Sequence, residues 1–155
     1  MNHFDDSRFP SRKSPRLKQF DYSTPNCYFL TICTWNKQCL FGNPGYLNTY
    51  GKAAEDGLLE IERHFSNAKL DKYVVMPNHV HMILSLHGSG SGVPTIIGLY
   101  KSYVSKRIHA ITSEVRVWQS SYHDHVIRNQ HSYEQIWQYI DSNPANWEKD
   151  CFYFE

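Results

Sequence analysis

The stretch Tyr73-Val74-Val75-Met76-Pro77-Asn78-His79-Val80-His81-Met82-Ile83-Leu84 holds two apolar runs separated by a proline and an asparagine. Because these two residues favour tight turns, the runs are predicted to form an antiparallel β-hairpin. Side chains of a strand alternate faces at about 3.3 Å per residue, so His79 and His81 project the same way, roughly 6 to 7 Å apart at the backbone. Val80, Met82 and Leu84 then point to the other face and are candidates for the core.

Two imidazoles on one strand face can bind a single metal ion, because histidine is a frequent metal ligand in proteins. The same pair also fits an ordinary polar strand face in contact with water. A further ligand elsewhere in the chain would favour the metal site.

Other segments supply the elements of one α+β domain. Strands are predicted over residues 28–35, which are β-branched and aromatic, and within 115–117 and 122–127. Helices are predicted over residues 49–65 and 96–108, where apolar residues recur at helical spacing. A last helix is predicted to begin at Ser132 as its N-cap, with Gln135 completing a capping box, and to end before Pro144.

This order of elements predicts an α+β fold with a ferredoxin-like antiparallel sheet and helices packed on one face. A chain of 155 residues suits one domain, which we expect over residues 20–155. Residues 1–19 are predicted to form a basic, flexible arm that carries Arg8, Arg12, Lys13, Arg16 and Lys18. Such an arm suits contacts with phosphates, and a merely solubilising tail is the alternative.

Composition excludes several classes of protein. The 16 Lys and Arg nearly balance the 15 Asp and Glu, so the net charge does not point to an anionic partner. No apolar run approaches the roughly 20 residues of a membrane span, and the N-terminus lacks the apolar region of a signal peptide. We therefore expect a cytoplasmic protein with no membrane partner. Its four cysteines have no Cys-x-x-Cys spacing and are expected to be reduced, which argues against a zinc finger.

The last predicted helix carries a tyrosine and an asparagine four residues apart, which places Tyr139 and Asn143 on one face. The amide oxygen of Asn143 is a candidate third ligand beside the two imidazoles. Tyr139 would then stand one helical turn away, about 6 Å along the axis, where a phosphate oxygen could bridge metal and phenol. Each residue also has an ordinary interpretation, as a packing tyrosine and as a helix-terminal asparagine.

Seven stretches of the chain match, in order, the motifs of a known family. The chain resembles the REP-associated tyrosine transposases, a branch of the single-tyrosine HUH endonucleases, in which two histidines flank a hydrophobic residue. The matching stretches are Phe20-Asp21-Tyr22-Ser23, residues 28–34, Val75-Met76-Pro77-Asn78-His79-Val80-His81, Lys101-Ser102, Trp118-Gln119, residues 124–129 and Tyr139-Ile140-Asp141-Ser142-Asn143-Pro144.

This resemblance implies a ferredoxin-like fold, His79, His81 and Asn143 as metal ligands, and Tyr139 as the nucleophile. It further implies an enzyme that cleaves and rejoins single-stranded DNA beside REP-like hairpins through a 5′-phosphotyrosine. The sequence leaves both a monomer and a homodimer open. Mixed nitrogen and oxygen ligands suit Mn²⁺ and tolerate Mg²⁺.

Several basic residues are candidates for contacts with DNA or for support of the metal site. His125 and Arg128 lie in a stretch that resembles the family, although that stretch also fits a structural role. The predicted helix over residues 96–108 carries Lys101, Lys106 and Arg107, which fit either a DNA backbone or a solvated helix face. The arm adds Arg12, Lys13 and Arg16.

Two other functions remain open from the residues alone. A zinc hydrolase could use His79 and His81, but such sites usually need a nearby carboxylate, and no Asp or Glu follows His81 until Glu114. A catalytically silent hairpin-binding protein would retain the basic residues without using the tyrosine.

Overall fold

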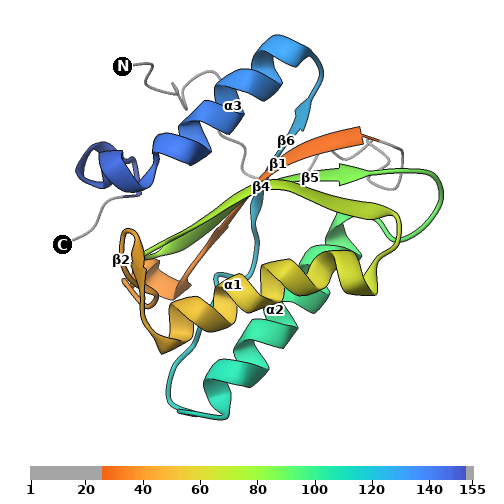
Figure 1. The fold of residues 1–155 in the computed structure, drawn as a ribbon. Helices are drawn as coiled ribbons and strands as arrows, with labels where there is room; N and C mark the ends of the chain where they lie inside the picture. The colour runs from red at the N-terminus through yellow and green to blue at the C-terminus, as the bar shows by residue number, and fades with distance from the viewer. Residues whose placement is uncertain (1–25, 153–155) are drawn as a thin grey trace.

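The computed structural model describes residues 26–152, so the predicted basic arm lies outside the described residues. Within this range a four-stranded antiparallel sheet is covered by helices on both faces (Figure 1). The main elements are β1 (Asn26–Cys33), α1 (Thr49–His64), β4 (Ala68–Met76), β5 (His79–Leu86), α2 (Val93–His109), β6 (His123–Ile127) and α3 (Gln130–Ser142). Short elements accompany them: η2 (Trp35–Lys37), β2 (Gly42–Asn43), β3 (Tyr46–Leu47) and η3 (Pro144–Lys149).

The sheet has the strand order β4-β5-β1-β6, and its three pairings are all antiparallel. With α1 between β1 and β4, and α2 between β5 and β6, this is the split β-α-β arrangement of a ferredoxin-like fold. Pro77 and Asn78 form the tight turn between β4 and β5, with Met76 opposite His79. The predicted α+β class, with helices against an antiparallel sheet, is therefore confirmed.

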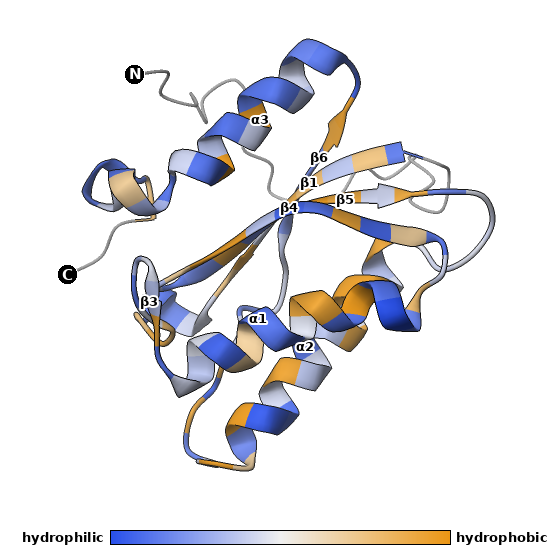
Figure 2. Cartoon of the chain, viewed as in Figure 1, coloured by the Kyte–Doolittle hydropathy of each residue, from blue (hydrophilic) through white to orange (hydrophobic). Residues whose placement is uncertain are grey.

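Helices α1 and α2 cover one face of the sheet and enclose the larger core. Val80, Met82 and Leu84 of β5 point into this core, as their alternation predicts. Along α1 and α2 hydrophobic positions alternate with hydrophilic ones (Figure 2), so each helix has one face for the core and one for solvent. No helix within residues 26–152 has both the length and the apolar character that a membrane crossing needs.

Helix α3 packs on the opposite face, whereas the sequence predicted helices on one face only (Figure 1). The reason lies in the strands, whose second face is also apolar over part of its area. Ile136 and Ile140 of α3 pack there against Phe29, Ile83 and Ile127. Both faces of the sheet therefore need a cover, and α3 supplies the second one.

The start of α3 also differs from the prediction. Asn129, and not Ser132, is its N-cap, and the Asn129 side chain accepts a hydrogen bond from the Ser132 backbone N–H at 2.8 Å. Asn caps helices as well as Ser does, so the helix begins three residues before the predicted position. The strand predicted within residues 115–117 does not form, and the next residue, Trp118, makes only an isolated bridge with Thr34.

Helices α1 and α2 cross closely at Gly57, and this contact gives a test of the fold. A Cβ at this position would lie 2.9 Å from Val104 Cγ2 and 3.0 Å from Tyr100 Cε2, both of which are buried. Gly57→Ala is expected to lower the free energy of unfolding by about 1 to 2 kcal/mol, because overpacking exceeds the helix-propensity gain of about 1 kcal/mol. Chemical denaturation measures the change.

Gly98 of α2 provides the matched control. A Cβ there meets no atom within 4 Å. Gly98→Ala should therefore raise the free energy of unfolding by about 0.5 to 1 kcal/mol. Equal effects of the two substitutions would contradict the close helix crossing.

Candidate functional site

His79 and His81 occupy the face of β5 that is turned toward α3. Their side chains are 0% and 1% exposed, and the two ring centroids are 4.5 Å apart. Thr31 of β1 lies opposite His81 in the sheet, and its hydroxyl is 2.8 Å from His81 Nδ1. The Nδ1 of His79 is 2.8 Å from the side-chain oxygen of Asn78. Each imidazole is thus held through Nδ1, which leaves its Nε2 for another group.

A carboxylate that the sequence reasoning missed completes this pair. Asp150 Oδ2 lies 3.8 Å from His79 Nε2, and the Asp150 side chain is fully buried. One potential ligand atom from each of His79, His81 and Asp150 lies within 4.8 Å of the others. Asp150 follows η3, far beyond His81 in the chain, so its spacing carries no signal. The absence of Asp and Glu between His81 and Glu114 therefore does not exclude a carboxylate at the site, because the C-terminal segment folds back over β5.

Asn143 joins the same cluster from the C-terminal end of α3. It is 2% exposed, and its amide Nδ2 donates a hydrogen bond to Asp150 Oδ2 at 2.5 Å. The Asn143 side chain also stands close enough to His79 to raise the pKa of that imidazole. Its oxygen Oδ1 has no hydrogen-bond partner among the described residues. The predicted third ligand therefore offers a free acceptor oxygen at the cluster.

The cluster has the donor set of a divalent cation site. Within residues 26–152, His79 Nε2, His81 Nε2 and Asn143 Oδ1 are buried without hydrogen-bond partners. Buried polar atoms without partners cost free energy, and a coordinated cation would satisfy all three together. The carboxylate of Asp150 would balance part of the charge of the cation. These residues fit a bound metal ion.

The protonation of the two imidazoles also suits metal binding. Burial lowers the pKa of His79 to about 4, although the Asp150 carboxylate acts in the opposite direction. Burial also lowers the pKa of His81 well below its ordinary value, and repulsion from the protonated forms of His79 and His123 adds to this effect. Both rings are therefore neutral near pH 7, which is the form that binds metal.

Tyr139 lies beside the imidazoles on the buried face of α3. It is 8% exposed, and its ring centroid is 5.3 Å from that of His81 in an edge-on arrangement. The ring of Phe152 lies against His79 from the C-terminal side, with the centroids 4.6 Å apart. A phenol, two imidazoles, a carboxylate and an amide oxygen thus meet in one water-poor region.

The other predicted residues lie at varying distances from this cluster. His125 of β6 pairs with Phe29 of β1, whose ring stacks on His81, so His125 lies on the same face of the sheet. Arg128 is exposed just beyond the end of β6. The predicted arm residues Arg12, Lys13 and Arg16 lie outside the described residues.

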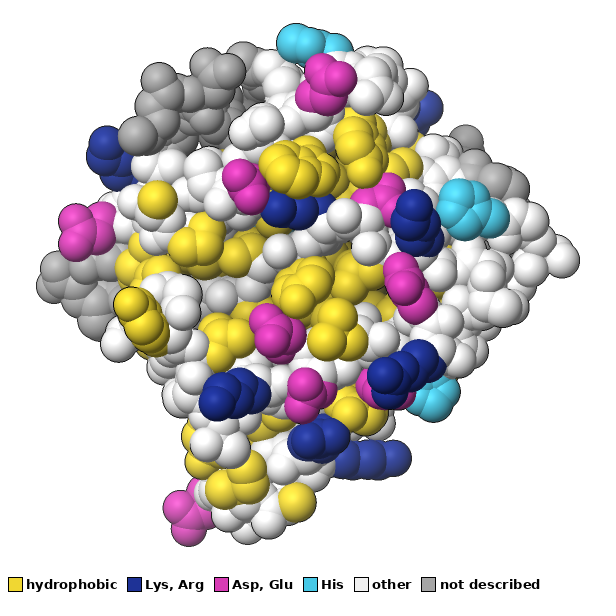
Figure 3. Space-filling model, viewed as in Figure 1, with side chains coloured by type: hydrophobic (Ala, Val, Ile, Leu, Met, Phe, Trp, Pro, Cys, Tyr) yellow, Lys and Arg dark blue, Asp and Glu magenta, His cyan; other side chains and the backbone are white. Residues whose placement is uncertain are grey.

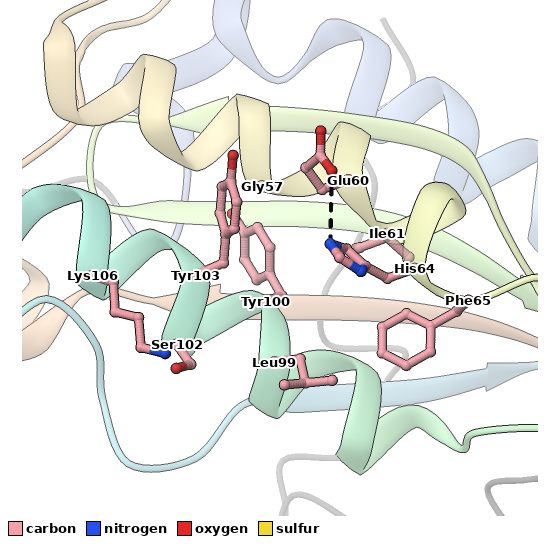
Figure 4. Close-up of a pocket in the computed structure, with 10 residues that line it drawn as sticks. All are labelled: Gly57, Glu60, Ile61, His64, Phe65, Leu99, Tyr100, Ser102, Tyr103 and Lys106. Atoms are coloured by element: carbon pink, nitrogen blue, oxygen red, sulfur yellow. Dashed lines mark ion pairs between the residues drawn. The ribbon is translucent and has the colours of Figure 1, made fainter.

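Lys101, Lys106 and Arg107 of α2 lie on the opposite side of the sheet from His79 and His81. They are therefore not placed to contact the two imidazoles. Lys101 Nζ donates to the Gln119 carbonyl at 2.6 Å, and Arg107 pairs with Asp56 at 3.5 Å. Lys106 borders a mostly apolar cavity of about 220 Å³ between α1 and α2 (Figure 4). On the side of the molecule shown in Figure 3, Lys and Arg are interspersed with Asp and Glu. That side therefore presents no continuous basic surface.

Comparisons with known proteins give a family for this chain and solved structures with a similar fold. Residues 48–143 match the family model described as transposase IS200-like. An uncharacterized protein of Haemophilus influenzae is 31% identical over 169 residues, which cover 93% of this chain and 94% of that protein.

Two solved structures are similar in fold, each with 20% sequence identity. A REP-associated tyrosine transposase bound to a REP hairpin has a TM-score of 0.61, covering 84% of this chain and 73% of that one. A candidate transposase from Deinococcus radiodurans has a TM-score of 0.55, covering 82% and 97%. Since the family model spans more than half of the chain and the H. influenzae relative aligns along nearly all of it, this chain belongs to the IS200-like transposase family.

Proposed function

We propose that this transposase is a metal-dependent endonuclease and strand transferase that acts on single-stranded DNA beside hairpins. The observation that carries the proposal is the buried cluster of His79, His81, Asn143 and Asp150 next to Tyr139. The similar structure that is bound to a REP hairpin supports hairpin DNA as the partner. His125 and Arg128 are proposed to contact the DNA backbone near this site.

The cluster would hold one divalent cation, Mn²⁺ or Mg²⁺, through two imidazoles, a carboxylate and an amide oxygen. Such an ion, when bound, polarises a phosphate and offsets the charge that develops on its oxygens. His79 and His81 bind in their neutral form, and Asp150 supplies negative charge. Because all four side chains are buried, DNA binding has to open the cover that Phe152 forms over His79.

Tyr139 is the proposed nucleophile. Its phenolic oxygen attacks the scissile phosphorus, so that an O–P bond forms while the bond from phosphorus to the 3′ oxygen breaks. The phenol releases one proton, and the leaving 3′ oxygen takes one up. The products are a 5′-phosphotyrosine and a free 3′-hydroxyl, and the covalent bond retains the linkage for rejoining.

A covalent-adduct assay tests the function as a whole. The protein is incubated with labelled single-stranded hairpin DNA and Mn²⁺, with and without a chelator, and is then resolved on a denaturing gel. A labelled protein band that requires Mn²⁺ is the expected result. Binding without an adduct would indicate a silent hairpin-binding protein. Cleaved DNA without an adduct would indicate a hydrolase, for which Asp150 now provides the carboxylate that the sequence lacked near His81.

Asp150→Asn tests the carboxylate as a metal ligand. The substitution retains the size of the side chain but removes its charge, so the affinity for Mn²⁺ should fall about tenfold or more. Titration calorimetry with Mn²⁺ alone measures the change. Glu148→Gln is the matched control, since Glu148 is an exposed carboxylate on the same segment. Equal affinities for all three proteins would remove Asp150 from the site.

Deletion of residues 1–18 tests the proposed DNA contacts of the arm. Each phosphate that the arm neutralises adds about 0.7 to 0.9 to the slope of log affinity against log salt concentration. Hairpin binding should weaken and this slope should flatten, while adduct formation at saturating DNA persists. A deletion of residues 1–7, which contain no Lys or Arg, serves as the control. An unchanged slope after the longer deletion would mean that the arm does not contact phosphates.

A further inference from the structure

We propose that Asn78 is a positioning residue, which holds the ring proton of His79 on Nδ1 and so directs the lone pair of Nε2 into the cation site. The inference rests on the metal site proposed above. In this way the folded protein would orient His79 for metal binding before an ion is bound.

The amide of Asn78 has only one satisfactory orientation. Asn78 is 1% exposed in the turn between β4 and β5, and its Nδ2 lies 3.2 Å from the Lys37 carbonyl oxygen and 2.7 Å from that of Phe152. Carbonyl oxygens accept hydrogen bonds and cannot donate them, so the amide NH₂ has to face both. The flipped amide would place Oδ1 against two other oxygens and lose both hydrogen bonds.

This orientation determines the tautomer of His79. Asn78 Oδ1 then faces His79 Nδ1 at a distance of 2.8 Å. Because an amide oxygen only accepts, Nδ1 has to carry the proton and donate it. A neutral imidazole has a single N–H, so Nε2 is left with an unshared electron pair. This is the atom that lies 3.8 Å from Asp150 Oδ2 and has no hydrogen-bond partner among the described residues.

The opposite tautomer fits neither the contact with Asn78 nor a bound cation. At Nδ1, two acceptors would face each other across 2.8 Å. At Nε2, a proton would occupy the position that a cation needs. Metal-binding histidines generally donate their second ring N–H to a partner that orients the ring, and Asn78 has the geometry for that role.

His81 provides a comparison within the same site. Its Nδ1 faces the hydroxyl of Thr31, which can either donate or accept a hydrogen bond. The hydroxyl alone therefore does not determine the proton position of His81, whereas the anchored amide does so for His79. Because Lys37 and Phe152 come from opposite parts of the chain, this anchor forms only in the folded protein.

Nitrogen NMR of the metal-free protein tests the inference directly. Protein labelled with ¹⁵N-histidine is kept in chelator at neutral pH, and long-range proton–nitrogen correlations report which ring nitrogen carries the proton. The His79 signals are assigned by their loss in His79→Gln. We expect His79 to show a protonated Nδ1 and an unprotonated Nε2. A protonated Nε2 in the wild-type protein would overturn the proposal.

Variants at Asn78 distinguish an effect on the His79 tautomer from an effect on folding. Asn78→Ala should release His79 toward the Nε2–H tautomer, which neutral imidazole prefers in water, and weaken Mn²⁺ binding about 10- to 100-fold. Asn78→Asp retains an acceptor opposite Nδ1 and should retain the tautomer, but its second oxygen cannot donate to the Lys37 and Phe152 carbonyls, so this variant should fold less stably. Thr34→Val is the control, since it removes a hydroxyl that bonds the Asn78 backbone carbonyl at 3.1 Å and leaves the amide in place. This control should leave the tautomer unchanged.

The outcomes distinguish this inference from the proposed function. An unchanged His79 tautomer in Asn78→Ala, or a switched one in Asn78→Asp, would overturn the role of Asn78. If neither Asn78 variant folds, the wild-type spectrum decides the matter. Because NMR is recorded without metal or DNA, a failed adduct assay with the expected tautomer would overturn the proposed function alone. A protonated Nε2 in a protein that forms the adduct would overturn the positioning role alone.

Discussion

Tyr139→Phe is expected to abolish the covalent protein–DNA adduct, with a loss of at least about a thousandfold in the rate of its formation. The substitution removes one oxygen, which is the atom proposed to form the bond to phosphorus. It leaves the ring in its contacts with His81 and Phe29, so folding and hairpin binding should remain close to those of the wild type. Single-turnover cleavage and a gel-shift titration measure the two properties separately.

Tyr133→Phe is the matched control on the same helix. The hydroxyl of Tyr133 donates to Asp71 Oδ2 at 3.0 Å. Burial, the hydrogen bond to Asp71 and the negative charge of Asp71 raise the pKa of Tyr133 to about 12. A phenol that is held so firmly in its protonated form is a poor nucleophile, and this variant should retain the adduct. An adduct that survives in Tyr139→Phe and disappears in Tyr133→Phe would reverse the assignment.

His81→Ala is expected to reduce cleavage at least about a hundredfold and to weaken Mn²⁺ binding in parallel. The variant removes one of two imidazoles, and the remaining ligands offer a cation fewer donors. Titration calorimetry with Mn²⁺ and single-turnover cleavage over a range of Mn²⁺ concentrations test the two effects. Partial recovery of cleavage at high Mn²⁺ would agree with weakened binding of the ion.

Two further variants distinguish the loss of a metal ligand from damage to the fold. His64 is exposed on α1, away from the cluster, and His64→Ala should leave both affinity and rate unchanged. His81→Leu retains more of the buried volume than His81→Ala and has no donor atom, so an equal loss of activity in both variants would indicate loss of the ligand and not a cavity. Wild-type cleavage in His81→Ala would show that the cation site lies elsewhere.

Local sequence predicted the structure correctly where a feature depends only on residues close together in the chain. The Pro77-Asn78 turn and the alternation in β5 predicted both the hairpin and the shared face of His79 and His81. Both depend on neighbours in the chain, since turn chemistry and strand alternation act over a few residues. The N-cap of α3 shows the limit of such reasoning, because Asn129 and Ser132 satisfy the same local rule.

The order of the main strands and helices, the shared strand face of His79 and His81 and the helical spacing of Tyr139 and Asn143 could all be predicted from local sequence. The position of α3 on the second face of the sheet and the contact of Asp150 with His79 became visible only in the folded chain. The tertiary structure also decided that the Asn78 amide meets carbonyl groups of Lys37 and Phe152. Residues that far apart have no shared local pattern, and their contacts follow from the burial of apolar surface on both faces of the sheet.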